Sequence, residues 1–120
     1  MNTRIRPIQC CAVPSAPVAI SDRERDQWLS SFRALSDPTR FDIFLLVAGQ
    51  EAPLCACDVG SRYELSQPTI SHHMKILSET GLIDVSRQGV WAYYQLSNEG
   101  RHVLDSLVRS PEVDLVESGR

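Results

Sequence analysis

The spacing of the apolar residues changes just after Gly81, and this change restricts the fold more than any other feature. Before Gly81, apolar residues recur every three or four positions, as in amphipathic helices. After it, residues 82–87 and 90–96 read as two strands around residues 88–89, a β-hairpin. A helical pattern returns over residues 97–109. The expected fold class is therefore mainly α with a small β-hairpin (α+β).

Four helices are expected before the hairpin. The first begins after Ser21, because a serine followed three residues later by Glu24 is a capping box. The second runs over residues 38–49, a short third over residues 56–63, and the fourth follows Ser66, a good N-cap. The apolar stripe expected on the second helix is Phe41, Phe44, Leu45 and Ala48, and that on the fourth is Ile70, Met74 and Leu77. This order of elements is typical of a winged helix-turn-helix, with about five helices and a two-stranded wing.

The chain is expected to form one domain between two terminal segments. Residues 1–20 hold three prolines and few charges, so we expect an extended arm. Residues 21–110 form the domain, and residues 111–120 an acidic, frayed tail. Because no apolar run approaches the roughly 18 residues of a membrane helix, and no signal core follows the N-terminal arginines, a cytoplasmic protein is expected.

The overall charge disfavours one class of nucleic-acid binder. A net charge of −3 argues against a general polyanion binder. A sequence-specific DNA-binding protein needs favourable charge on one face only. Residues 65–76 hold one lysine and no acidic residue, so this segment is suited to such a face.

Polar residues at the start of the fourth helix are the candidate DNA contacts. A helix that reads base edges needs polar side chains at its N-terminal end, where glutamine can pair with adenine and hydroxyl groups suit bases or phosphates. A lysine one turn further and an arginine near the hairpin tip are placed for phosphates or the minor groove. The candidates are Ser66, Gln67, Thr69, Ser71, His72, Lys75 and Arg87. A merely solvated helix face is the alternative, and His73 is interpreted as a structural, hydrogen-bonded histidine.

Four cysteines form two close pairs, Cys10–Cys11 and Cys55–Cys57. In a cytoplasm such thiols stay reduced, which favours metal or redox chemistry over structural disulfides. Adjacent cysteines, moreover, rarely bridge without strain. The alternative is that these cysteines are only small buried residues.

Together these features resemble the ArsR/SmtB family of metal-responsive repressors. The resemblance rests on ALSDPTRFDIF (34–44), LCACD (54–58), LSQPTISHHMKIL (65–77), GLIDVSRQGVWAYYQL (81–96) and the helix after Ser97, and it covers about residues 26–108. It implies a homodimer, joined through the first and last helices, on a palindromic operator DNA. It also implies that the apo-protein represses and that a bound metal or metalloid releases the DNA.

The LCACD stretch resembles the sensing motif of family members that respond to arsenic, antimony, cadmium or lead, most closely that of the arsenic-resistance repressors. The arsenite-sensing pattern Cys-x-Cys-x-x-Cys would have its third cysteine where this chain has Gly60. Other members take ligands from the N-terminal arm. The resemblance therefore makes Cys10, Cys11, Cys55 and Cys57 the candidate metal ligands, from one or both protomers. The family's zinc site on the last helix is not expected, because His102 and Asp105 do not match its pattern.

Cysteines at positions i and i+2 diverge on a regular helix. They converge if Cys55 is the N-cap of the short helix and Cys57 its second residue, because an N-cap has non-helical dihedrals. The helix N-terminus is also expected to favour the thiolate form. Three thiolates suit arsenite or antimonite, the expected inducers, whereas four could suit cadmium, lead or zinc. No organic cofactor is expected.

Three other functions remain open. A thiol oxidoreductase with Cys55 or Cys57 as nucleophile is disfavoured, because the chain has neither a βαβ pattern nor a Cys-x-x-Cys motif, and no enzymatic activity is expected. A repressor of the same fold could instead respond to thiol oxidation. A winged helix that binds only proteins is the remaining alternative.

Overall fold

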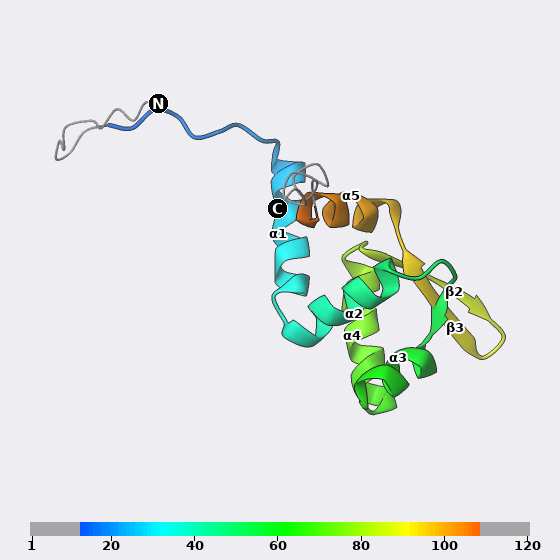
Figure 1. Ribbon diagram of the computed structural model, residues 1–120. Helices are drawn as coiled ribbons and strands as arrows, with labels where there is room; N and C mark the ends of the chain where they lie inside the picture. The colour runs from blue at the N-terminus through cyan, green and yellow to red at the C-terminus, as the bar shows by residue number, and fades with distance from the viewer. Residues whose placement is uncertain (1–12, 109–120) are drawn as a thin grey trace, which may run out of the picture.

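The computed structural model describes residues 13–108 of the chain, which contain five helices and three strands. Their order is α1 (Asp22–Leu35), α2 (Pro38–Ala48), β1 (Leu54–Cys55), α3 (Ala56–Tyr63), α4 (Gln67–Glu79), β2 (Ile83–Gln88), β3 (Trp91–Leu96) and α5 (Asn98–Leu107). In Figure 1, α1 and α5 occupy one end of the molecule, and α3 lies at the other end beside α4, with the hairpin of β2 and β3 projecting from the same side. This is a winged helix-turn-helix of the α+β class, as predicted.

Capping side chains fix where the helices begin. Ser21, Asp37 and Ser97 are N-caps, and each accepts a hydrogen bond from the backbone N–H three residues later, at 3.0, 2.9 and 2.8 Å. At Asp37 the bond from the Arg40 N–H lowers the pKa of the carboxyl group. Because these caps are local in sequence, the helix starts expected after Ser21 and at residue 38 are confirmed.

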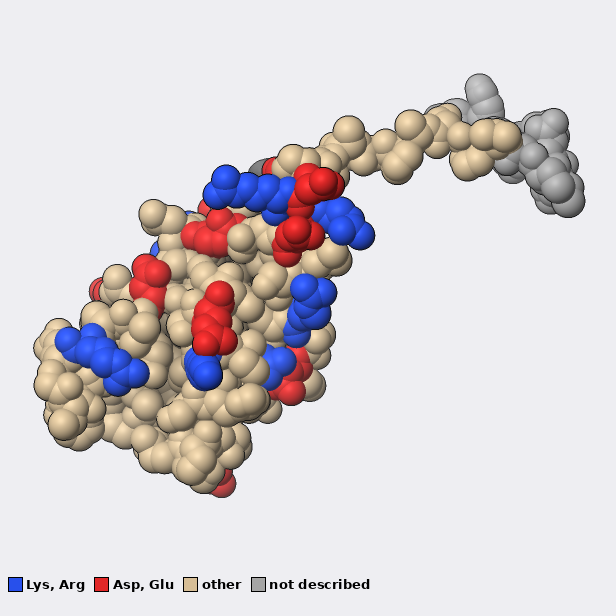
Figure 2. All heavy atoms as spheres, turned by 180° about the vertical axis from the view of Figure 1, so that it is seen from behind, with Lys and Arg blue, Asp and Glu red and all other residues tan. Residues whose placement is uncertain are grey.

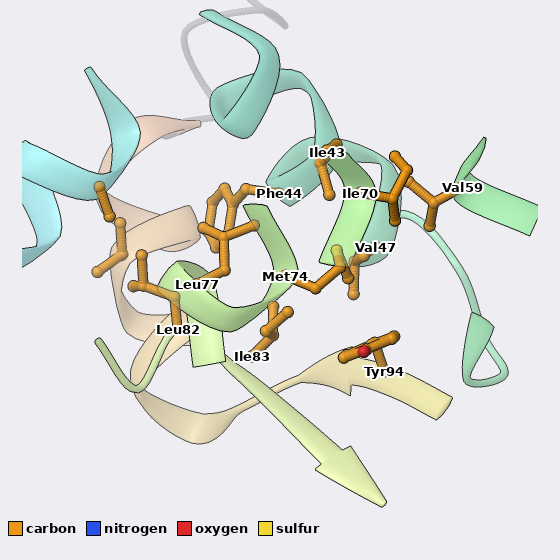
Figure 3. Packing of buried hydrophobic residues seen from close by; sticks show 12 residues of the cluster. Ile43, Phe44, Val47, Val59, Ile70, Met74, Leu77, Leu82, Ile83 and Tyr94 are labelled. Carbon is orange, nitrogen blue, oxygen red and sulfur yellow. The ribbon is translucent and has the colours of Figure 1, made fainter. Parts of the chain in front are cut away.

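The hydrophobic core is built around α4. Its residues Ile70, Met74 and Leu77 are fully buried, as predicted. Figure 3 shows Met74 and Leu77 between Phe44 of α2 and Ile83 of β2, and Ile70 beside Val59 of α3. Burial of each such side chain stabilises the fold by about 1.5–3 kcal/mol, so the core holds α4 firmly against the helices before it and the sheet after it.

The prediction for α2 is wrong except at one residue. The buried side chains of this helix are Ile43, Phe44 and Val47. Leu45 is 40% exposed, and Phe41 and Ala48 are half-buried. The reason is that α2 lies among α1, α4, α5 and β3, so several neighbours decide which side chains are covered, and a single apolar stripe does not.

The sheet contains a strand that the sequence did not reveal. β1 pairs antiparallel with β3, with Leu54 opposite Tyr94 and Cys55 opposite Tyr93, and the strand order is β1-β3-β2. Two residues are too few to show a strand period. Through this pairing with β3, β1 adds a third strand to the wing, and it ends at the start of α3.

The hairpin turn lies one residue later than predicted. Gln88 pairs with Trp91, so the connecting residues are Gly89 and Val90. Gly89 has φ +65°, the conformation that favours glycine at the first position of a tight hairpin turn. The backbone requirement of the turn thus places Gln88 in the strand.

The terminal segments are described only in part. Residues 13–20 of the predicted arm are exposed and are in neither helix nor strand. Cys10, Cys11 and the predicted tail 111–120 lie outside the described residues. Within residues 13–108, the search for a helix long and apolar enough to cross a membrane found none.

Candidate metal centre and nucleic-acid interface

Cys55 is the N-cap of α3. Its backbone is extended, with φ −89° and ψ 163°, and its N–H donates a hydrogen bond of 3.1 Å to Oδ2 of Asp58. On its other side Cys55 lies opposite Tyr93 in the sheet. Ala56 is then the first helical residue, Cys57 the second and Asp58 the third, which confirms the predicted start of this helix.

The N-cap geometry brings the two thiols together. The Sγ atoms of Cys55 and Cys57 are 2.7 Å apart, and Oδ2 of Asp58 is 3.4 Å from the Cys55 Sγ. Cys55 is half-buried and Cys57 is exposed. Among the described residues, these three side chains are the group whose ligand atoms all lie within 4.8 Å of one another.

This arrangement fits a thiophilic ion after a small adjustment. Two sulfurs bound tetrahedrally to one ion at about 2.3 Å each are about 3.8 Å apart. The thiols must therefore separate by about 1 Å, and the exposed Cys57 side chain has room to rotate. The described residues supply two sulfurs and one carboxylate to such a site.

The expected effect of the helix N-terminus on Cys57 is not observed. The hydrogen bond with the Cys55 thiol raises the pKa of Cys57, and desolvation and the nearby Asp58 carboxylate act in the same direction. The prediction of a stabilised thiolate is thus wrong for Cys57, since its immediate neighbours outweigh the helix terminus.

The seven candidate DNA contacts lie on α4 and the wing, and all are exposed: Ser66, Gln67, Thr69, Ser71, His72, Lys75 and Arg87. Ser66 is the N-cap of α4, and its hydroxyl donates to Oγ1 of Thr69 at 2.9 Å. Lys75 is 3.7 Å from Glu79 in an exposed ion pair, one of the weak kind. Between α4 and the wing lies a hollow of ≈ 350 Å³ lined by residues that include Lys75 and Arg87.

His73 faces α2, unlike His72. Its Nδ1 lies 3.5 Å from Nη1 of Arg40, and the Nε of Arg40 donates to the Ala34 carbonyl at 2.8 Å. Burial lowers the pKa of His73, and the Arg40 charge acts in the same direction against the opposing effect of Asp37. This contact agrees with the structural role predicted for His73.

Charge is unevenly spread over the surface. On the face drawn in Figure 2, acidic and basic side chains are mixed over the end from which the arm leaves, and the opposite end is largely uncharged. This face therefore carries no broad positive field.

Comparison with known proteins identifies the family. The family model described as bacterial regulatory protein, arsR family, matches residues 37–85. An arsenical resistance operon repressor from Staphylococcus aureus is 37% identical over 78 residues, which are 65% of this chain and 70% of that protein. The chain belongs to the ArsR family. Its relatives place it among transcriptional regulators and not among enzymes, as predicted.

Other ArsR relatives carry related names. Arsenic resistance transcriptional regulator ArsR1 from Pseudomonas putida is 40% identical over 78 residues, 65% of this chain and 60% of that protein. A cadmium resistance transcriptional regulatory protein CadC homolog from Staphylococcus aureus is 41% identical over 68 residues, 57% of this chain and 55% of that protein. The matches thus span little more than half of these two relatives.

Solved structures share the fold. The homodimeric winged helix-turn-helix DNA-binding domain of Mb0332 from Mycobacterium bovis has a TM-score of 0.61 at 24% identity, covering 85% of this chain and 91% of that one. HlyU from Vibrio cholerae has a TM-score of 0.61 at 22% identity, covering 72% and 97%. These likenesses support the winged helix-turn-helix assignment.

Two features of the candidate site of this ArsR-family chain were missed by reasoning from sequence. Asp58 is one, although its place at the third position of a capped helix was a usable signal. Trp91 is the other, since it lines a hollow beside Cys57. No local pattern could have placed the wing next to α3.

Proposed function

We propose that this chain is a metalloid-responsive transcriptional repressor that binds operator DNA as a homodimer and is released when trivalent arsenic or antimony binds its cysteine thiols. The observation that carries the proposal is the 2.7 Å approach of the Cys55 and Cys57 Sγ atoms at the start of α3. The names of the arsenical resistance relatives support arsenic as the signal.

The thiol set needs at least one more member for a three-sulfur site. Cys10 and Cys11, in the predicted arm, would supply it, from the same protomer or from its partner. Arsenous acid then exchanges each of its three hydroxyl groups for a thiol sulfur. Each hydroxyl group leaves together with one thiol proton as a water molecule, so three As–S bonds form and no electron is transferred. This exchange accepts a thiol that carries its proton, because the hydroxyl group that leaves arsenic takes up that proton.

The helix that holds the thiols packs directly on the helix that carries the candidate DNA contacts. Val59 of α3 is fully buried beside Ile70 of α4 (Figure 3). A ligand that ties the arm to α3 would alter the position or mobility of α4. Only a ligand with unequal affinity for the DNA-binding and released states shifts that equilibrium.

The homodimer would form through α1 and α5. These helices leave apolar side chains uncovered, with Phe32 60% and Leu107 49% exposed. Between them, and against α2, lies a hollow of ≈ 410 Å³ whose lining includes Trp28, Leu35 and Val103. An apolar surface of this kind is typical of a subunit interface.

The proposal is tested by operator release. A DNA duplex selected from a random-sequence library by the purified protein serves as the operator, and its affinity is measured with and without arsenite. Arsenite is expected to weaken binding in the wild type by at least about tenfold, and to have little effect in Cys55→Ser or Cys57→Ser. Arsenate is the control, since it offers no trivalent arsenic. Full release of both variants by arsenite would disprove the role of these thiols.

A cadmium- or lead-responsive repressor is the second candidate. It is favoured by the Asp58 oxygen, 3.4 Å from the Cys55 Sγ, which would add an oxygen ligand, and by the CadC-like relative. X-ray absorption separates the two, because arsenic would be bound by sulfur alone and cadmium by sulfur and oxygen. Release by peroxide without any metalloid would instead indicate the thiol-redox repressor.

A further inference from the structure

A hollow of ≈ 240 Å³ connects the thiol region with the candidate DNA-binding surface. Cys57 lines it from α3, and Gln67 and Ser71 line it from α4. Arg87 and Trp91 close it from the wing. Three elements that are separate in sequence thus share one small space, and the lining includes three of the candidate DNA contacts.

The two thiols differ in their relation to this hollow. Cys57 is part of its lining and Cys55 is not, although their Sγ atoms are only 2.7 Å apart. Cys55 is held by its pairing with Tyr93 and by the bond from its N–H to Asp58. A group attached to the exposed Cys57 thiol can therefore extend into the hollow, whereas one attached to Cys55 starts outside it.

The wing side of the hollow is lightly packed. Val90 is 87% and Trp91 55% exposed, at the turn end of the hairpin. Trp91 lies two residues along β3 from Tyr93, the pairing partner of Cys55. Because the inner part of β3 is fixed to α3 through β1 and its outer end carries an exposed indole ring, that outer end is the part that yields when the hollow fills.

We propose that a group bound to Cys57 weakens operator binding within its own protomer, by filling this hollow and displacing Trp91 and the wing away from α4. The inference rests on the proposed DNA-binding function, but not on the identity of the inducer. Arg87 moves with the wing, and Gln67 and Ser71 are screened by the bound group. Trp91 acts here as a positioning residue.

The test uses two variants with one cysteine each. Cys10→Ser/Cys11→Ser/Cys55→Ser keeps only Cys57, and Cys10→Ser/Cys11→Ser/Cys57→Ser keeps only Cys55. Each is labelled with N-ethylmaleimide, whose double bond forms a C–S bond while the thiol proton passes to the neighbouring carbon. Mass spectrometry measures the labelled fraction, and operator affinity is measured before and after labelling.

The label on Cys57 is expected to weaken operator binding about 10- to 100-fold, as loss of one or two DNA contacts would. The label on Cys55 is expected to change it less than about threefold. Equal losses from both labels, or no loss from the Cys57 label, would overturn the inference and leave the proposed repressor intact. If neither unlabelled protein bound DNA, the proposed function itself would fail.

The role of Trp91 is tested separately in the variant that keeps only Cys57. Trp91→Ala opens the hollow and is expected to reduce the effect of the label to less than about threefold, whereas Trp91→Phe keeps a ring and the full effect. Trp28→Phe leaves Trp91 as the single tryptophan, so labelling of Cys57 should shift its fluorescence emission. An unchanged emission together with an unchanged label effect in Trp91→Ala would exclude the indole ring as the moving part.

Discussion

At the scale of the residue, one backbone conformation makes the candidate metal centre. The extended dihedrals of Cys55 remove the roughly 100° per residue that separates neighbouring helical side chains. Cys57 then lies beside it and not across the helix. A cysteine pair of the same spacing in the middle of α3 could not bring its sulfurs so close.

Gly60 occupies the position of the third cysteine in the arsenite-sensing pattern. A Cβ atom added there would meet its nearest neighbours, among them Leu65 O and Ile70 Cγ1, at 3.5–3.8 Å, which is ordinary contact. Gly60→Cys should therefore fold. In Cys10→Ser/Cys11→Ser, which is expected to lose its response, it should restore arsenite-dependent release to within about tenfold of the wild-type arsenite concentration.

Gly60→Ser is the matched control for that rescue, since it adds a similar side chain without a thiol. Release is read by fluorescence anisotropy of the selected duplex. A wild-type response in Cys10→Ser/Cys11→Ser, or equal rescue by serine, would contradict the need for a third sulfur.

His73 should make stability depend on pH. Its pKa is lowered in the fold, chiefly by burial, so the neutral form is favoured there. The stabilisation is complete above the ordinary histidine pKa, about 6.5, and declines as the pH falls below it. The fall in Tm between pH 7.5 and pH 5 should be smaller in His73→Gln than in the wild type.

His72→Gln supplies the comparison, because His72 is the exposed neighbour on the same helix. It should keep the wild-type pH dependence when thermal unfolding is followed by circular dichroism. The reverse result, in which only His72→Gln reduces the pH dependence of Tm, would show that His73 is not the histidine responsible.

At the scale of the element, the start of α5 is fixed on the turn after α4. Ser97 is buried, and its hydroxyl donates to the Gly81 carbonyl at 2.6 Å while accepting from the Gly100 N–H. The Ser97 N–H donates to the Leu82 carbonyl at 3.2 Å. α5 is thereby tied to the end of α4 and the beginning of β2, so a change in α4, the helix of the candidate DNA contacts, can reach the predicted dimer interface.

Gly100 is required for this close approach. A Cβ atom there would lie 2.1 Å from the Leu82 carbonyl oxygen and 2.7 Å from Cδ1 of Leu96. Because a backbone oxygen cannot give way, Gly100→Ala should destabilise the domain by about 1–3 kcal/mol or more, as overpacking does. The measurement is urea unfolding.

Gly49→Ala is the paired substitution. Gly49 has φ −85°, and its added Cβ would meet backbone oxygens at 3.5 and 3.7 Å, which is ordinary contact. Its stability should change by no more than about 0.5 kcal/mol. Similar stabilities for the two variants would show that α5 does not rest as tightly on Leu82 as described.

At the scale of the whole molecule, the candidate metal site and the candidate DNA contacts occupy one end of the domain and the uncovered apolar surface the other (Figure 1). The hollow beside Cys57 offers a short route from ligand to DNA inside each protomer. The junction at Ser97 offers a longer one, towards α5. The first route acts within one protomer, whereas the second passes through a helix of the proposed dimer interface.

Phe32→Glu should break the proposed dimer. The ring is 60% exposed on α1, and a carboxylate in an apolar interface is unfavourable unless it is paired. Sedimentation should show a monomer, with operator affinity reduced about 100-fold because simultaneous binding to two half-sites is lost. Helix content should stay unchanged.

Leu45→Glu is its control, since Leu45 is also exposed, at 40%, but lines a different hollow together with Arg62 and Tyr63. It should remain dimeric. If Phe32→Glu stayed dimeric and bound DNA normally, the surface formed by α1 and α5 would not be the interface.

The sequence by itself determined the features that depend on near neighbours. The caps at Ser21 and Ser66 and the buried spacing of α4 were predicted, as was Cys55 as the N-cap of α3. Each depends on side chains within about one or two helical turns, where capping and periodicity act.

Only the tertiary structure decided the rest. The buried face of α2, the two-residue strand β1 and the position of Trp91 beside Cys57 depend on elements far apart along the chain. The raised pKa of Cys57 depends on how closely Cys55 and Asp58 approach, which the spacing of residues does not give. Burial, strand pairing and charge are settled by what lies nearby in space, and for these residues that is set by the packing of the whole domain.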